Sequence, residues 1–196
     1  MSPAERPRLF YDLGSPYAYL AVERAPSVLG VDPLLEPILL GPIFVPSGHG
    51  SWAHTDTRAT NVAEVERRAA AAGLPPVAWP PGWPPNTLHA MRAVLWAGHH
   101  GRGDAFARAA FRHAFVRGAD LGAAAELRDV ARAVGLPDAE LEGAIADPAI
   151  KQELKDRTAR AIDLGVRGVP TVAAAGRRFY GDDHLEEAAA ALRAVA

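Results

Sequence analysis

Strand-like segments occur at the two ends of this 196-residue chain, and the long stretch between them has a helical pattern. Near the start, the short apolar runs Leu9–Leu13 and Leu34–Ile43 have the length and the flanking prolines and glycines of strands. Near the end, Thr171–Ala174 and Arg178–Tyr180 flank a turn at Ala175-Gly176. A chain with strands at both ends must bring those ends together to complete one sheet.

Helices are expected to connect these strands. One from Pro16 to about Leu29 separates the first two strands, with Pro26 bending it or marking its end, and a last one starts at about Asp183. The chain therefore opens as βαβ and closes as ββα. Between these units the sequence predicts the following helices, with Asp138 and Asp147 as N-caps: Asn61–Ala72, one capped by Asn86 or Thr87, Asp104–Val116, Ala124–Val134, Asp138–Ile145 and Pro148–Leu164. We expect one α/β domain from 1–43 and 166–196, with 44–165 as an all-helical insertion.

Composition excludes several classes of function. Hydrophobic residues make up 49% of the chain and the net charge is −2, which is typical of a globular protein and argues against a nucleic-acid partner. The chain has no cysteine, so it can supply neither a disulfide nor a thiolate of its own. No segment resembles a signal peptide or a membrane span, so we expect a cytoplasmic protein without a membrane partner.

The stretch "DLGSPYAYL" places a hydroxyl at the start of the first helix. Ser15 is followed by Pro16, and a serine before a proline is a strong helix start, because the serine caps free amides and the proline needs no donor there. Ser15 also lies in the positive field of the helix N-terminus, which favours an anion or a thiolate. The sequence around Ser15 leaves both a capping role and a functional role open.

Several stretches in order carry a family resemblance: "FYDLGSPYAYLA", "EPILLGPIF", "PPNTLHAMRA", "GVRGVPT" and "FYGDDHLEE". The chain resembles DsbA-like thioredoxin-fold proteins, and within them the 2-hydroxychromene-2-carboxylate isomerases and kappa-class glutathione transferases. The resemblance runs from Phe10 to Glu187. It implies a thioredoxin-like fold in which Ser15 occupies the position of the redox motif.

The resemblance also implies a glutathione site. Ser15 would hydrogen-bond the glutathione sulfur and favour its thiolate. Val169, before a cis Pro170, would pair its backbone with the cysteinyl part, while Asp182 and Asp183 would take the γ-glutamyl end. Without the resemblance, two aspartates at a helix start would be interpreted as caps.

The chain departs from the family pattern at basic positions. His184 stands where relatives usually carry arginine, and the loop "SGHGSWAHT" has His49 and His54 but no lysine. His49 is a candidate cofactor-binding or acid–base group, or else a solvated loop residue. The histidine spacing matches no common zinc pattern, and we predict no metal site.

The resemblance implies an isomerase or transferase that uses glutathione on a conjugated aromatic acid or electrophile, in a homodimer. Trp52, Trp79 and Trp83 would either line its apolar pocket or cover the junction between sheet and insertion. One alternative is an enzyme that uses another low-molecular-weight thiol. A second is a redox-inactive, DsbA-like binding or chaperone-like protein in which Pro170 holds an extended peptide.

Overall fold

The two ends of the chain form one four-stranded mixed sheet. The computed structural model describes residues 6–47 and 50–195. The strands are β1 (Arg8–Tyr11), β2 (Leu34–Pro37), β3 (Thr171–Ala174) and β4 (Arg177–Tyr180), in the order β2-β1-β3-β4. β1 is parallel to β2 and antiparallel to β3, and β3 forms a hairpin with β4. The expected βαβ and ββα units are confirmed.

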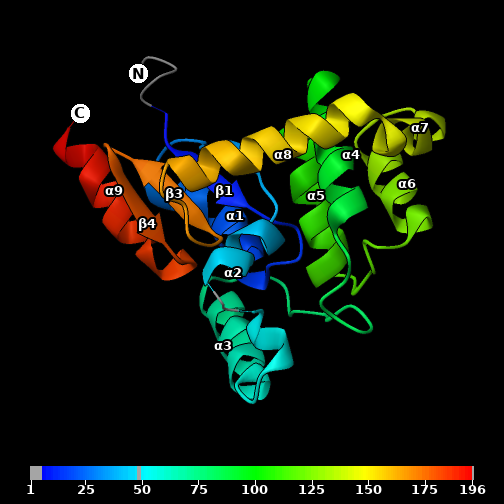
Figure 1. Cartoon of the computed structure of the whole chain (residues 1–196). Helices are drawn as coiled ribbons and strands as arrows, with labels where there is room; N and C mark the ends of the chain where they lie inside the picture. Colours follow the sequence, from blue (N-terminus) through cyan, green and yellow to red (C-terminus); the bar gives the residue numbers. More distant parts are fainter. Residues whose placement is uncertain (1–5, 48–49, 196) are drawn as a thin grey trace.

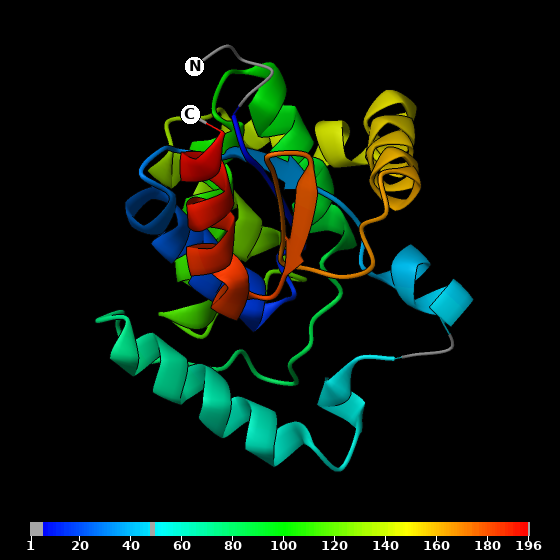
Figure 2. The same cartoon turned by 90° about the vertical axis from the view of Figure 1, so that its left-hand side faces the viewer.

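Helices cover both faces of this sheet. On one side lie α1 (Pro16–Leu29) and α9 (Leu185–Ala194), and on the other lies α8 (Pro148–Asp163) (Figures 1 and 2). The remaining helices are α2 (Gly41–Ser47), α3 (Arg58–Ala71), α4 (Leu88–His99), α5 (Gly103–Phe115), α6 (Ala124–Ala133) and α7 (Leu141–Ala146), with short 3-10 turns η2 (Trp52–His54), η3 (Asp138–Glu140) and η4 (Asp182–His184). The predicted border at 43/44 falls inside α2.

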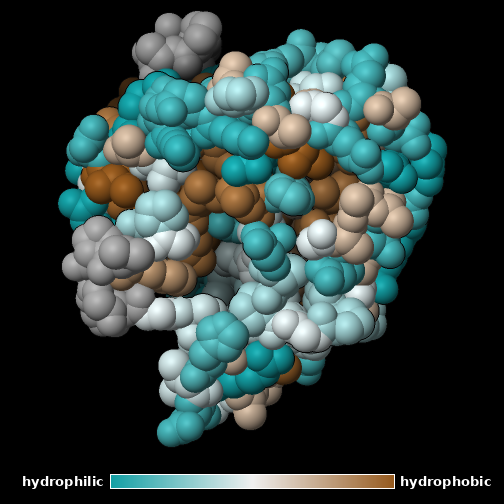
Figure 3. All heavy atoms as spheres, turned by 45° about the vertical axis from the view of Figure 1, so that its right-hand side comes forward, coloured by the Kyte–Doolittle hydropathy of each residue, from teal (hydrophilic) through white to brown (hydrophobic). Residues whose placement is uncertain are grey.

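The main apolar core joins the sheet to the helical insertion. Tyr11, Tyr19 and Phe111 are fully buried in it, and the rings of Tyr11 and Phe111 lie 5.6 Å apart between their centroids. Where the two parts meet, hydrophobic residues gather in a hollow surrounded by a hydrophilic rim (Figure 3). None of the described helices combines the length and apolar character needed to cross a membrane.

The predicted helix from Pro16 to about Leu29 is confirmed, but Pro26 does not mark its end, and the second predicted strand is shorter than expected. α1 continues through Pro26 to Leu29 and ends at Gly30, whose φ of 70° suits a left-handed cap. Pro26 cannot donate to the carbonyl of Val22, but Arg108 Nη1 donates to that oxygen at 2.7 Å and replaces the missing bond. The predicted second strand stops at Pro37, and α2 follows, because Pro42 suits the start of a helix.

Two cap predictions were also tested. Asp147 caps α8 through the amide of Ala149 at 2.7 Å, as predicted. Asp138 is not a cap, because its carboxylate binds Arg132 Nη1 at 2.6 Å instead. Before α4, Asn86 Oδ1 accepts from the Leu88 amide at 3.1 Å.

Candidate active site

Ser15 lies at the buried N-terminus of α1. Its amide donates to the carbonyl of Asp12 at 3.0 Å, which closes the turn after β1. Its hydroxyl oxygen accepts from the amide of Ala18 at 3.2 Å, so the predicted N-cap is confirmed. The residue is 7% exposed. No described residue accepts a hydrogen bond from the hydroxyl, and its proton therefore remains available to an acceptor.

The electrostatic field at this helix end favours an anion. The first turn of α1 contains no acidic residue, and Pro16 occupies its first position. The free amides of the first turn and the helix dipole together give the end a partial positive charge. A thiolate next to the Ser15 hydroxyl would be stabilised both by this field and by a hydrogen bond.

The loop before β3 brings a peptide-binding edge to the same end of the sheet. The Val169–Pro170 bond is cis, as the resemblance implied. Phe10 pairs with Thr171, so the residues before Thr171 lie beside the end of β1 that leads into Ser15. Neither the amide nor the carbonyl of Val169 is hydrogen-bonded to another residue that the structure describes. The backbone of Val169 can therefore pair with an extended ligand.

The two aspartates of η4 have different environments. The carboxylate of Asp182 is 1% exposed and is bound by Arg68 Nη1 at 2.7 Å and Arg24 Nη1 at 3.2 Å. Burial raises the pKa of Asp182, and the two guanidiniums oppose that shift. Asp183 is 52% exposed and lies 3.4 Å from Arg68. The structure thus gives Asp182 two arginine partners in place of the ligand that the resemblance implied. Asp183, in contrast, is exposed and contacts Arg68 and His184.

These charges surround a hollow of about 350 Å³ between α1, α3 and the start of α9. It is lined by both signs of charge, from Arg24, Arg67, Arg68, Asp182, Asp183 and Glu186. Such a mixture suits the zwitterionic end of an amino acid, which needs a cation for its carboxylate and an anion for its ammonium group. Sequence analysis could not predict that Arg68 and Arg24 bind Asp182, because they lie 114 and 158 residues from it along the chain.

An aromatic cluster borders the Ser15 turn. The ring centroids of Trp52 and Trp83 are 4.8 Å apart, and those of Tyr17 and Trp52 are 6.0 Å apart. Trp83 Nε1 donates to the carbonyl of Gly14 at 3.2 Å, which fixes the cluster beside Ser15. Trp83 is buried and covers the junction, whereas Tyr17 and Trp52 are half-buried. The burial of Trp83 fits the junction-covering alternative, and whether the half-buried Trp52 and Trp79 line a substrate pocket stays a prediction.

Arg58 is a cation at this cluster that the sequence analysis missed. Its guanidinium lies 5.4 Å from the Trp83 ring centroid, and Nη1 donates to the carbonyls of Ala53 and Trp83 at 3.0 Å each. The loop lacks lysine, but Arg58 stands three positions after Thr55, at the start of α3. This guanidinium places a positive charge at the aromatic side of the site.

A buried carboxylate supports the Ser15 turn from below. Asp12 Oδ1 accepts from the Gly14 amide and the Thr87 hydroxyl at 2.9 Å each, and Oδ2 accepts from the Leu40 amide at 3.0 Å. Burial raises the pKa of Asp12, and these three hydrogen bonds oppose the shift. Asp12 thus connects the turn before α1 to the segments that precede α2 and α4.

Of the histidines that the sequence analysis considered, His184 lies at the site, with Nδ1 3.2 Å from Asp183 Oδ1. His49 lies outside the described residues, and His54 is exposed. Within the part of the chain that the structure describes, His113, Glu126 and Asp129 are close enough to share an ion. However, His113 faces Glu126 at 2.6 Å, and Asp129 is paired with Arg132. Each of the three therefore already has a partner.

Comparison with known proteins identifies a family. A family model described as a DSBA-like thioredoxin domain matches residues 8–193. Among curated proteins, none matches the sequence.

Solved structures share the fold at low sequence identity. A 2-hydroxychromene-2-carboxylate isomerase matches with a TM-score of 0.85 at 19% identity, over 96% of this chain and 95% of that one. A probable DsbA oxidoreductase from Streptomyces coelicolor matches with a TM-score of 0.76 at 20% identity, over 96% and 90%. The cytosolic disulfide reductase DsbM from Pseudomonas aeruginosa, solved with GSH, matches with a TM-score of 0.63 at 20% identity, over 97% and 96%. At these identities the likeness establishes the thioredoxin-like fold with its helical insertion.

Proposed function

This chain belongs to the DsbA-like thioredoxin domain family, and from that membership we propose that it binds glutathione at the N-terminus of α1 and acts as a glutathione-dependent isomerase or transferase. One observation carries the proposal. Ser15 presents a hydroxyl proton without a described acceptor, at a positive helix end, in a chain that contains no cysteine. This arrangement can stabilise a thiolate that the protein does not itself contain.

The residues around Ser15 fit the parts of a glutathione molecule. The unpaired backbone of Val169 suits the cysteinyl segment, which is extended and has one amide and one carbonyl to pair. The hollow near Asp183 and Arg68 suits the γ-glutamyl end, with its ammonium and carboxylate groups. The DsbM relative was solved with GSH, which supports this choice of thiol, and its cytosolic location supports a cytoplasmic one here.

The chain's own groups then have defined tasks. When bound, glutathione supplies a sulfur nucleophile for reversible addition to a conjugated acid, which allows a double bond to rotate. Ser15 donates a hydrogen bond to the sulfur and lowers the pKa of the thiol from its free value of about 8.5. Tyr17 and Trp52 offer ring faces to an aromatic substrate, and Arg58 offers a cation to its carboxylate.

Calorimetric titration and a rate assay test this proposal together. We expect glutathione to bind more tightly than S-methylglutathione, because the methylated sulfur cannot become a thiolate. With 2-hydroxychromene-2-carboxylate as substrate, the absorbance change should accelerate on adding protein and glutathione together. If neither compound binds, or if the rate does not depend on glutathione, the proposal is wrong. Mass spectrometry of the purified protein would identify any other thiol that it retains.

The free backbone of Val169 also supports a second candidate, a binding or chaperone-like protein. An extended peptide could pair with this backbone in the same way as glutathione. Fluorescence anisotropy with an unfolded peptide separates the two functions. Tight peptide binding that glutathione does not displace would favour the chaperone-like function, and displacement by glutathione would favour the enzyme.

Absence of redox activity is a further expected result. Two of the structural relatives are described as an oxidoreductase and a disulfide reductase, but this chain has no sulfur nucleophile for thiol–disulfide exchange. In an insulin-reduction turbidity assay, the protein should leave the background rate of the reductant unchanged. Turnover above that background would contradict this expectation.

A further inference from the structure

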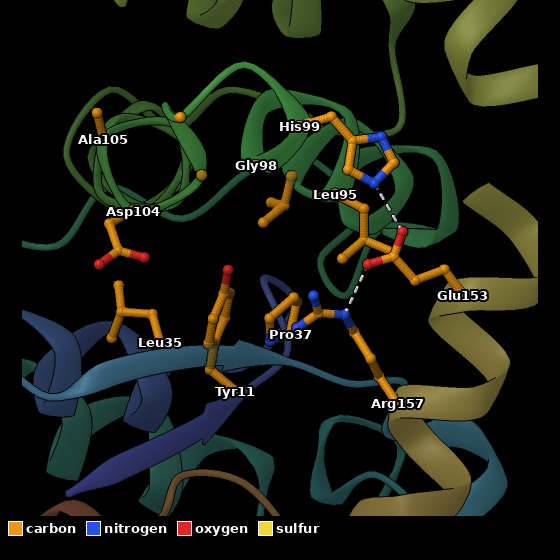
Figure 4. A pocket seen from close by; sticks show the side chains of 13 residues that line it. Tyr11, Leu35, Pro37, Leu95, Gly98, His99, Asp104, Ala105, Glu153 and Arg157 are labelled. Carbon is orange, nitrogen blue, oxygen red and sulfur yellow. Dashed lines mark hydrogen bonds and ion pairs between the residues drawn. The ribbon is translucent and has the colours of Figure 1, made fainter. Parts of the chain in front are cut away.

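A cavity of about 410 Å³ lies away from the candidate active site, where the edge of the sheet meets the helical insertion. It is open to solvent on one side and is lined by β1, β2, the end of α4, the start of α5 and α8 (Figure 4). The N-terminal end of α4 lies near the candidate active site, because Thr87, the residue before α4, bonds to Asp12. The C-terminal end of α4 lines the cavity. At 1.5 Å per residue, the two ends of α4 are about 18 Å apart. The volume lies within the range of about 300–1,000 Å³ for small-molecule sites.

The floor of this cavity holds a polar group without a protein partner. Tyr11 is fully buried, and its hydroxyl points into the cavity (Figure 4). The hydroxyl has no hydrogen bond to any residue that the structure describes. Buried polar groups are nearly always hydrogen-bonded, because an unpaired one loses its hydration without compensation. Because Tyr11 lines the cavity, a molecule that occupies the cavity can supply this hydrogen bond.

A carboxylate faces the same space. Asp104 lies in the first turn of α5, and its side chain points toward the cavity beside Tyr11 (Figure 4). Its carboxylate makes no hydrogen bond or ion pair with another of the described residues. Asp104 is an exposed residue that also lines the cavity, and the partial burial of its carboxylate raises its pKa, while the charges of Arg108 and Arg6 oppose the shift. An unpaired carboxylate and an unpaired phenol thus lie at one end of the cavity.

The cations on the opposite wall are already paired. Arg157 donates to Glu153 at 2.9 Å and to Glu36 at 3.1 Å. His99 Nε2 lies 2.8 Å from the second oxygen of Glu153. These four groups form a row, Glu36–Arg157–Glu153–His99, in which Arg157 and His99 each have a carboxylate partner. This wall therefore offers no free positive charge to an anionic ligand.

We propose that this cavity binds a small organic cation, a protonated amine on a compact hydrocarbon body. The ammonium group donates to the carboxylate of Asp104 and to the hydroxyl oxygen of Tyr11, which can both accept. The hydrocarbon body packs against Leu35, Pro37 and Leu95, which line the same space. We infer the positive charge of the ligand from the acceptors on Asp104 and Tyr11, and its apolar body from the hydrophobic residues that line the cavity.

Calorimetric titration with benzylamine, which is protonated at neutral pH, tests the proposal. Benzyl alcohol is the neutral control of similar shape. We expect benzylamine to bind with one site per chain and at least about 10-fold more tightly than the alcohol, because the charged hydrogen bond is lost in the alcohol. Chemical shifts in the NMR spectrum should change at Tyr11 and at the start of α5. Equal affinity for the two compounds, or no benzylamine binding at about 10 mM, would overturn the proposal.

Variants locate the binding. Asp104→Asn should weaken benzylamine binding about 10-fold or more and leave benzyl alcohol unaffected. Tyr11→Phe should weaken it by a smaller factor, and circular dichroism would check that the variant folds. Asp32→Asn is the matched control, because Asp32 is 72% exposed, pairs with Arg108 nearby and does not line the cavity. If Asp32→Asn weakened binding as much as Asp104→Asn, a general charge effect would replace the proposed site.

Discussion

Replacing Ser15 by alanine is expected to raise the pKa of bound glutathione and to reduce activity by about 10- to 1000-fold, the scale of losing one positioned donor. The free energy of unfolding should fall by only about 1 kcal/mol, the contribution of an N-cap. The reason is that the hydroxyl oxygen already caps the amide of Ala18, while its proton has no described acceptor. The capping and donating roles use different parts of the same group.

Two measurements separate these roles. Thiolate absorbance is titrated against pH with glutathione on the wild type and the variant, beside a urea melt of each. Asp147→Ala is the matched control, because Asp147 caps α8 with a proline at the next position, as Ser15 caps α1. The control should lose a similar amount of stability and leave the thiol pKa unchanged. A Ser15 variant with a lower stability and an unchanged thiol pKa would show that Ser15 is a cap and nothing more.

Features encoded within a few neighbouring residues were predicted from the sequence. The Ser15-Pro16 helix start, the Asp147 cap and the Ala175-Gly176 turn depend on local backbone chemistry, and all three are present. The cis state of Pro170 came from the family resemblance rather than from the local sequence. The single sheet followed from the need to bring the strands at the two chain ends together, but its order β2-β1-β3-β4 was not predicted.

Features that depend on distant partners were missed. Local sequence predicts that Pro26 disturbs the helix, because it cannot donate to the carbonyl of Val22. Arg108, which is 86 residues from Val22 along the chain, donates to that carbonyl instead. Asp182 and Asp183 look alike in sequence, and they differ in the structure because Arg24 and Arg68 bury one of them. The residues next to an aspartate in the sequence do not indicate which arginine of another helix will pair with it in the folded protein.

Asp12 is the largest functional feature that the sequence analysis passed over. It lies inside the stretch "DLGSPYAYL", where a single acid before a glycine suggests an ordinary turn. Its oxygens also reach Leu40 and Thr87, which lie 28 and 75 residues away. Asp12 as a whole residue is 6% exposed, so its carboxylate supports the Ser15 turn from inside the protein.

We expect Asp12→Ala to lower the free energy of unfolding by about 2–4 kcal/mol at neutral pH, because three buried donors lose their acceptor. Asp120→Ala is the matched control. Asp120 Oδ1 accepts from the Gly122 amide at 2.8 Å, as Asp12 does from Gly14, but at a partly exposed site with one donor. The control should cost about 1 kcal/mol or less. Equal losses for the two variants, measured in urea melts, would show that Asp12 serves one turn and does not join three segments.

The pH dependence of this loss has a defined sign. Burial raises the pKa of Asp12 in the folded protein above the unfolded value of about 3.9. The folded state therefore binds the proton more readily, so the contribution of Asp12 to stability is greatest below the unfolded pKa and decreases as the pH rises through the folded one. The stability difference between wild type and Asp12→Ala should be larger near pH 4 than at pH 7, because the other titrating groups cancel in the comparison. A difference that grows with rising pH would mean that the three hydrogen bonds outweigh burial and hold the folded pKa below its ordinary value.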